Sequence, residues 1–318
     1  MSNQIFQTLK ELLTPLSQSQ CVLHKHELLI CGGYEQRACY SYHTLKNEYK
    51  FICEYPSDVK LIGHCVLRLV DNNKHKNQIT LLSFGGFFKH TLMMKYVSVW
   101  SNTSNKSNEL SHYNQWIPFI DNHNHRIIIG KNENHNYNGV RAVIGGVKNN
   151  LLFITYPSKD ISVFDLNIFQ FIKNDELPTK HSILYHCLDY QFEYDEDNNT
   201  FKFRQLLVCD DIAPFNYYAY MRINDVILFF GGYCYPNVVS KSVHKYSIRE
   251  NKWMTFQNTL PSPLCECVAI LSEEDNYIHI IGGRDDKETT VSTHIKTNVR
   301  IFDSSLLVMI CLFIDETK

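Results

Sequence analysis

The sequence predicts an all-β chain in which six related, strand-rich units follow one another. Two recurring patterns support this: an apolar strand that ends in a glycine pair, and two large aromatic residues that follow it seven positions apart. A repeat of about 50 residues cannot bury its own apolar face and must pack on its neighbours. We therefore expect a single repeat domain over residues 1–318.

The fifth unit is the most complete and serves as the template. Residues 217–223 are typical of a strand, Asn224-Asp225 favours a tight hairpin turn, and residues 226–230 form a continuous apolar run, as expected of a strand covered on both faces. Four residues complete the signature: Gly231, Gly232, Tyr246 and Trp253. Paired glycines let the backbone turn sharply beside a neighbouring segment, while the aromatic residues fill the space between adjacent sheets.

Three other units carry the same signature with variations. Unit 1 has a Tyr in the place of the Trp, and in unit 2 a Ser/Asn-rich insertion at 101–111 separates the last two strands. The signature positions are Gly32, Gly33, Tyr42 and Tyr49 in unit 1, Gly85, Gly86, Trp100 and Trp116 in unit 2, and Gly282, Gly283 and Phe302 in unit 6.

Unit 3 contains a glycine pair that is out of register with the template. Residues 149–154 align with the second strand of unit 5, so Tyr156-Pro157 stand in the glycine positions. Gly145-Gly146 then belong to the first strand. On this alignment Phe164 and Phe171 keep the seven-residue aromatic spacing.

Unit 4 departs furthest from the pattern. Residues 194–201 keep the aromatic spacing around a polar turn, and residues 181–188 are a candidate first strand. No apolar strand ending in Gly-Gly lies between them. We therefore expect this unit to be incomplete.

An apolar strand closed by Gly-Gly, then a Tyr and seven residues later a Trp, resembles the kelch repeat, and the resemblance covers residues 21–302. It implies a six-bladed β-propeller of four-stranded antiparallel blades around a central channel, with the fourth blade incomplete. The outer strand of the last blade comes either from 5–9, within the segment 1–16, or from the apolar run 306–314. The units span roughly 17–55, 56–119, 139–175, 181–207, 215–258 and 264–318.

Composition and charge exclude several function classes. The net charge is −2 and no basic stripe is interleaved with aromatic residues, so we expect no nucleic acid partner. The longest apolar run has nine residues, far short of the roughly 20 that span a bilayer, and residues 1–16 do not resemble a secretory signal. The cysteines, 11 in all, lie mostly in apolar strands, which favours a reduced, cytoplasmic protein without a membrane partner.

No catalytic signature is present: the chain lacks phosphate-binding glycine loops, a Gly-x-Ser-x-Gly elbow, a His-Glu-x-x-His motif and a Cys-x-x-Cys pair. Three histidines, His123, His125 and His135, share an Asn-rich stretch, and two at i and i+2 on a strand could bind a metal with the third. The competing and favoured interpretation is a polar surface loop. We expect no cofactor and no enzymatic activity.

The loops that join the second and third strands should emerge together around the channel, where a rigid scaffold presents variable residues. In kelch proteins such a face commonly holds a peptide, so the resemblance implies a protein or peptide partner. The candidate binding residues in these loops are Arg37, Lys89, His90, Tyr235 and Arg284. The alternatives are a propeller enzyme, either a metal-dependent oxidase or sugar-modifying, and a decayed or fragmentary kelch copy.

Overall fold

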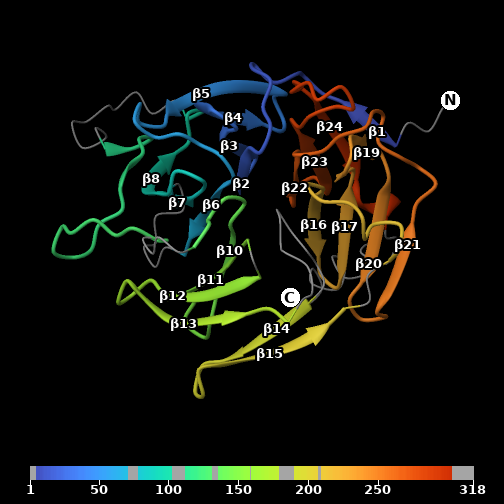
Figure 1. Cartoon of the computed structure of the whole chain (residues 1–318). Coiled ribbons are helices and arrows are strands. Elements are labelled where there is room, and N and C mark those ends of the chain that lie inside the picture. The colour runs from blue at the N-terminus through green and yellow to red at the C-terminus, as the bar shows by residue number, and fades with distance from the viewer. Residues whose placement is uncertain are drawn as a thin grey trace, which may run out of the picture.

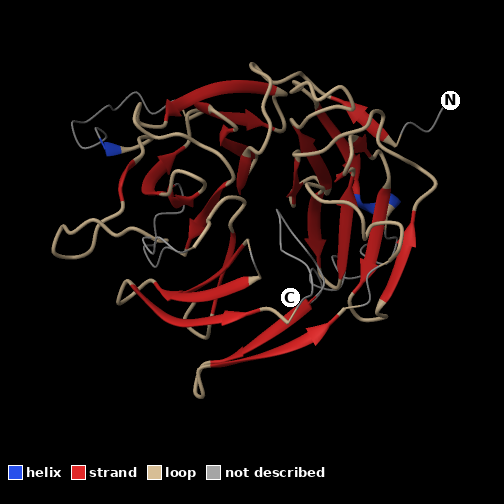
Figure 2. Cartoon of the chain, in the orientation of Figure 1, coloured by secondary structure: helices blue, strands red, loops and turns tan. Residues whose placement is uncertain are grey.

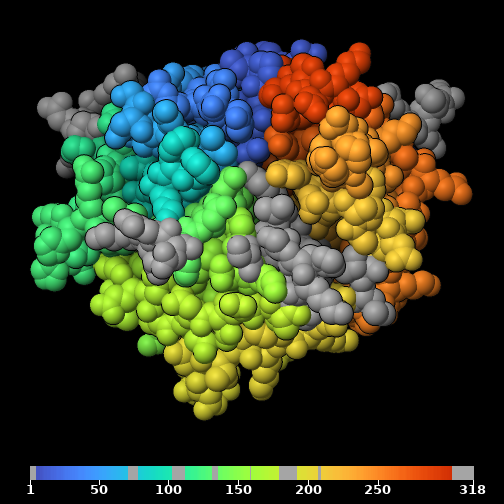
Figure 3. Space-filling view, viewed as in Figure 1, coloured from blue at the N-terminus to red at the C-terminus, as the bar shows by residue number. Residues whose placement is uncertain are grey.

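The computed structural model describes residues 5–70, 78–101, 112–130, 135–157, 159–178, 190–206 and 209–302. They form a ring of antiparallel sheets around a central axis, a β-propeller, and successive units follow one another around the ring (Figures 1 and 3). Helical structure in these residues is confined to short turns such as η2 (Val299–Ile301), as Figure 2 shows. None of the described helices is long and apolar enough to cross a membrane.

The strands follow the unit order. Units 1 to 3 contain β2 (Gln20–His24), β3 (Glu27–Gly33), β4 (Gln36–His43) and β5 (Glu48–Glu54); β6 (His64–Leu69), β7 (Gln78–Gly85), β8 (His90–Val97) and β9 (Ile117–Pro118); and β10 (Arg141–Gly145), β11 (Leu151–Tyr156), β12 (Asp160–Asp165) and β13 (Gln170–Glu176). Unit 4 contains β14 (Tyr190–Asp195) and β15 (Thr200–Gln205). Units 5 and 6 contain β16 (Ala219–Ile223), β17 (Val226–Phe230), β20 (Val243–Ser247) and β21 (Lys252–Thr255), then β22 (Val268–Ser272), β23 (Tyr277–Ile281) and β24 (His294–Asn298).

The structure confirms four-stranded antiparallel blades but not the expected number of six, which included an incomplete fourth blade. Among the described residues five sheets have four strands, and unit 4 is a two-stranded sheet of β14 and β15. This ribbon packs through Phe192 and Phe201 on the apolar residues of unit 3. The candidate first strand at 181–188 lies outside the described residues. In the sequence no apolar strand ends in Gly-Gly in unit 4, and the described part of this unit contributes only the hairpin of β14 and β15.

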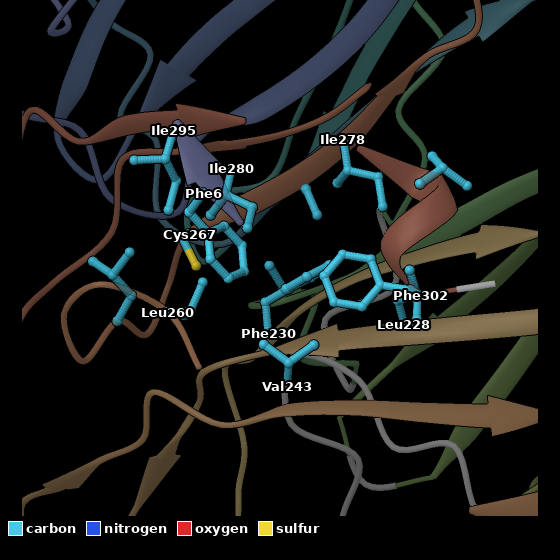
Figure 4. Packing of buried hydrophobic residues seen from close by; sticks show 14 of the residues in the cluster. Phe6, Leu228, Phe230, Val243, Leu260, Cys267, Ile278, Ile280, Ile295 and Phe302 are labelled. Carbon is cyan, nitrogen blue, oxygen red and sulfur yellow. The ribbon is translucent and has the colours of Figure 1, made fainter. Parts of the chain in front are cut away.

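The fourth strand of unit 6 comes from the N-terminus. β1 (Phe6–Thr8) pairs antiparallel with β24, with Phe6 opposite Thr297. Phe6 is buried beside Phe302, with ring centroids 6.4 Å apart, in the apolar cluster between units 5 and 6 (Figure 4). Main-chain hydrogen bonds therefore join the beginning of the chain to its last blade. The competing candidate, 306–314, lies outside the described residues.

The seven-residue aromatic spacing produces one recurring hairpin between the third and fourth strands. Tyr42 and Tyr246 lie directly opposite Tyr49 and Trp253, with ring centroids 4.9 and 5.0 Å apart. The Tyr42 hydroxyl donates to Oδ1 of Asn47 at 2.8 Å, and the hairpins of units 5 and 4 repeat this bond: Tyr246 to Asn251 at 2.6 Å and Tyr194 to Asn199 at 2.6 Å. Each of these asparagines has a positive φ, which Asn tolerates in tight turns.

Unit 2 keeps this arrangement with a different residue from the one expected. Tyr96, not Trp100, lies opposite Ile79 of β7, as Tyr42 lies opposite Leu28 of β3. Trp100 follows the strand and donates its Nε1 to Ser41 of unit 1 at 2.9 Å.

Trp116 is buried between units 1 and 2. Its ring stacks on Tyr55 at 4.6 Å, and its Nε1 donates to the Cys39 sulfur at 3.3 Å. Both tryptophans in unit 2 therefore join two units, but they do not form the expected pair.

The first glycine of each pair lies at the end of the second strand of its blade, against the segment that leads into the next unit. A Cβ on Gly231 would be 2.0 Å from the carbonyl oxygen of Leu264, and one on Gly282 would be 2.3 Å from that of Leu16. Both glycines also have positive φ, which a side chain disfavours. The glycine pairs thus permit close contact between neighbouring blades.

Unit 3 follows the predicted register. Gly145 ends β10, and Tyr156 ends β11 in the place of the first glycine. Its buried ring stacks on Tyr137 at 4.6 Å, so an aromatic pair fills the space that the glycine backbone occupies elsewhere.

Candidate functional site

The two ends of the ring are formed by different loops. In antiparallel four-stranded blades, the loops between the second and third strands lie at the same end as the connections between units, and the remaining turns lie at the other end. We call the first end the junction face and the second the turn face. Backbone hydrogen bonds join the two kinds of junction-face segment, for example Gly232 N–H to Leu264 O at 2.8 Å.

A ring of residues with positive φ surrounds the channel at the junction face. In every four-stranded blade this residue lies just before the innermost strand: Gln18, Gly63, Gly139, Tyr217 and Glu266. Backbone hydrogen bonds connect successive members: Glu266 N–H to Tyr217 O at 2.8 Å, Gln18 N–H to Glu266 O at 2.9 Å and Gly139 N–H to Gly63 O at 2.8 Å. Between units 1 and 2 a side chain replaces the backbone acceptor: Oε1 of Gln18 accepts from Gly63 N–H at 3.1 Å.

The channel mouth contains a cavity of about 330 Å³ lined by the innermost strands β2, β6, β10, β16 and β22. Its lining includes an acid, Glu266, and a base, Arg141. Burial raises the pKa of Glu266, and hydrogen bonds from Gln18 and Ser17 partly oppose this effect. Burial also raises the pKa of Tyr220, while the charge of Arg141 acts in the opposite direction. The mouth therefore offers hydrogen-bonding groups of both charges to a polar ligand.

Arg37 and Arg284 make contacts within their own blades. Arg37 donates Nη1 to the Tyr55 carbonyl at 3.1 Å, and its Nη2 is 3.2 Å from the Glu54 carboxylate. Arg284 donates Nε and Nη2 to the carbonyl of Glu288, at 3.3 and 3.1 Å. Both guanidinium groups thus hold junction-face segments in place.

Lys89 and His90 are both half-buried, and each contacts a neighbouring side chain. The Lys89 ammonium lies 5.9 Å from the ring centroid of Tyr137. His90 is half-buried, its Nε2 is 2.7 Å from the Ser83 hydroxyl, and burial lowers its pKa to about 4. His90 is therefore neutral near pH 7 and adds no positive charge to the face.

Tyr235 is the most prominent of the five predicted residues. It lies at the tip of a small ribbon of β18 (Tyr233–Cys234) and β19 (Val238–Val239), within the loop between β17 and β20. Its side chain is 85% exposed. A hydrogen bond from the Tyr233 hydroxyl to Asn237 at 3.2 Å braces the ribbon below it.

Site selection from the sequence missed three exposed aromatic residues on the same loops. Tyr34, Phe87 and Phe88 follow the glycine pairs of units 1 and 2 directly, and Phe87 is 60% exposed. The rings of Phe87 and Phe88 lie edge to face at 5.0 Å, and the Lys60 ammonium lies 5.2 Å from the Phe88 ring. In the sequence these three residues are recognisable because blade packing does not require an aromatic residue directly after the glycine pair.

The three histidines considered for a metal do not come together. His135 contacts Tyr156, with Nδ1 2.9 Å from the hydroxyl. His123 and His125 instead lie beside Asp121 in the connection from unit 2 to unit 3. Among the described residues this is the one cluster of three potential ligands.

No known protein family and no curated protein matches this sequence. Among solved structures, the chain is similar to one titled "Structure of YjhT", with a TM-score of 0.63 and 14% sequence identity over 92% of this chain and 98% of that one. At this identity the likeness concerns the fold alone. Together with the sheet topology it shows that the chain is a β-propeller.

Proposed function

We propose that this protein is a kelch-type propeller that binds a protein or peptide partner through its junction face, without catalysis and without a cofactor. The observation that carries this proposal is the exposure of Tyr34, Phe87, Phe88 and Tyr235 on loops of three different blades at one end of the ring. Large exposed aromatic residues on a rigid scaffold are typical anchors of protein interfaces. None of the cysteines in the described residues forms a disulfide, which supports the proposal of a cytoplasmic setting.

The kelch assignment rests on physical features that go beyond the spacing of residues. The glycine pairs contact the following unit, and the paired aromatic residues share a hairpin in which a tyrosine donates to an asparagine. Both features explain why the signature needs those residue types at those positions.

The partner segment should contain an apolar anchor. Phe87 and Phe88 form a continuous aromatic surface, with Lys60 and Lys89 beside it, while Asp285 and Glu288 on unit 6 are acidic. An apolar side chain of the partner would bury the Phe pair, and the flanking charges would select its orientation.

The test compares two double variants in quantitative affinity capture. Phe87→Ser/Phe88→Ser removes the anchor on the junction face (60% and 48% exposed), and Leu45→Ser/Val147→Ser removes apolar residues that are more exposed (67% and 88%) on the turn face. A partner that is retained by the control and lost by the junction-face variant supports the proposal. Retention by both variants contradicts it, and thermal melts show that each variant is folded.

The channel mouth supports a second candidate, a small polar ligand bound between Glu266 and Arg141, which corresponds to the enzyme alternative. A screen of small polar compounds by thermal shift would find stabilisation that Glu266→Gln abolishes. Such a result without any effect of the Phe87/Phe88 change would favour this candidate.

A further inference from the structure

The connection between units 2 and 3 contains a short loop whose shape is set by one carboxylate. Oδ1 of Asp121 accepts the backbone N–H groups of His123 and His125, both at 2.8 Å. The Asp121 N–H donates to the His125 carbonyl at 2.9 Å, and a bridge between Ile120 and Arg126 closes the loop below. These bonds fix the loop backbone and so hold the three residues close together.

The fixed backbone brings three metal-binding groups together. Oδ2 of Asp121 lies 3.1 Å from Nδ1 of His125, and the rings of His123 and His125 stack with centroids 6.0 Å apart. One ligand atom from each of the three residues lies within 4.8 Å of the others. Two ligands bound at 2.0–2.2 Å in a tetrahedral site are roughly 3.3 Å apart, close to the Asp121–His125 separation.

We infer that Asp121, His123 and His125 form a binding site for a borderline divalent cation of the Zn²⁺ class. Two imidazoles and one carboxylate are the donor set that zinc accepts in sites with an open coordination position.

Access to the site requires no opening of the fold. The His125 side chain is 78% exposed, and the loop belongs to a junction-face connection. Because the three protein ligands leave one tetrahedral position, water or an outside donor completes the coordination. The binding role does not depend on the partner proposed above, and its test is separate.

The experiment titrates the full-length, reduced protein with Zn²⁺ in a calorimeter and with Co²⁺ followed by visible absorption. We expect one site in the wild type and a loss of at least about tenfold in affinity for His123→Asn and for His125→Asn, since even outer-shell changes cost 10–100-fold. Asp121→Asn keeps an oxygen acceptor for the loop and removes the charge, so it should weaken binding with the loop intact.

The matched control is His112→Asn, which removes an exposed histidine outside the cluster and should leave the affinity unchanged. The absence of one-to-one binding by the wild type would overturn the assignment. So would equal affinities for the wild type and both histidine variants, since the metal would then be bound elsewhere.

Discussion

Acid should destabilise this propeller, because several of its histidines are buried in the neutral form. His279 and His294 lie between units 6 and 1, each 1% exposed, with Nδ1 of His279 2.9 Å from Nε2 of His294. The Tyr49 hydroxyl of unit 1 is 2.5 Å from Nδ1 of His294. Burial lowers the pKa of His279 to about 4 and lowers that of His294 well below its ordinary value.

The size and direction of the effect follow from these pKa values. An unfolded histidine binds a proton below pH 6.5, whereas folded His279 does not until about pH 4. The contribution of His279 to the free energy of unfolding is therefore constant above pH 6.5 and falls by about 1.4 kcal/mol per pH unit between pH 6.5 and about pH 4. Over that window His279 alone accounts for a loss of about 3 kcal/mol. Burial lowers the pKa of His64 to about 3 and adds to the same trend.

The assay is urea unfolding between roughly pH 7.5 and pH 4.5. His279→Asn should lower the free energy of unfolding at neutral pH, because it alters a buried hydrogen bond. The slope of this free energy against pH should be shallower than in the wild type, because one histidine fewer takes up a proton on unfolding. His112→Asn, at an exposed position, should change neither the free energy of unfolding nor its pH dependence. A pH slope that is the same in His279→Asn and the wild type would refute the reasoning.

Two further predictions concern closure and the contact between blades. Phe6→Ala should lower the free energy of unfolding by about 3–5 kcal/mol, since the ring is 4% exposed, and a loss below 1 kcal/mol in denaturant melts would contradict the role of β1. Gly231→Ala should cost more than the roughly 1–2 kcal/mol of a left-handed alanine, because its Cβ would also meet the backbone of Leu264. An unchanged melting temperature would show that this junction adjusts freely.

The architecture was predictable where one residue type has one possible role. Gly231 and Gly282 mark close contacts between blades, because a Cβ there would meet backbone, and Tyr42 and Tyr246 mark third strands, because their spacing to Tyr49 and Trp253 is intact. The register of unit 3 was also correct despite its misleading glycines, since the apolar run of β11 determined it.

Other features depend on spacing that the sequence alone does not constrain. The insertion at 101–111 breaks the interval in unit 2, so Trp100 was assigned the role of Tyr96. Likewise His135, close to His125 in sequence, contacts Tyr156, while the Asp121 carboxylate accepts the backbone N–H of His125. The total of six blades was wrong, because the hairpin of unit 4 carries the aromatic signature without a four-stranded sheet among the described residues.

Hydrogen exchange of the protein with a captured partner bound tests the central claim most directly. The account predicts slower exchange at 33–36, 86–90 and 233–239, the junction-face loops of units 1, 2 and 5, and no change at 44–47 and 146–149 on the turn face. Slower exchange confined to the turn face would contradict it.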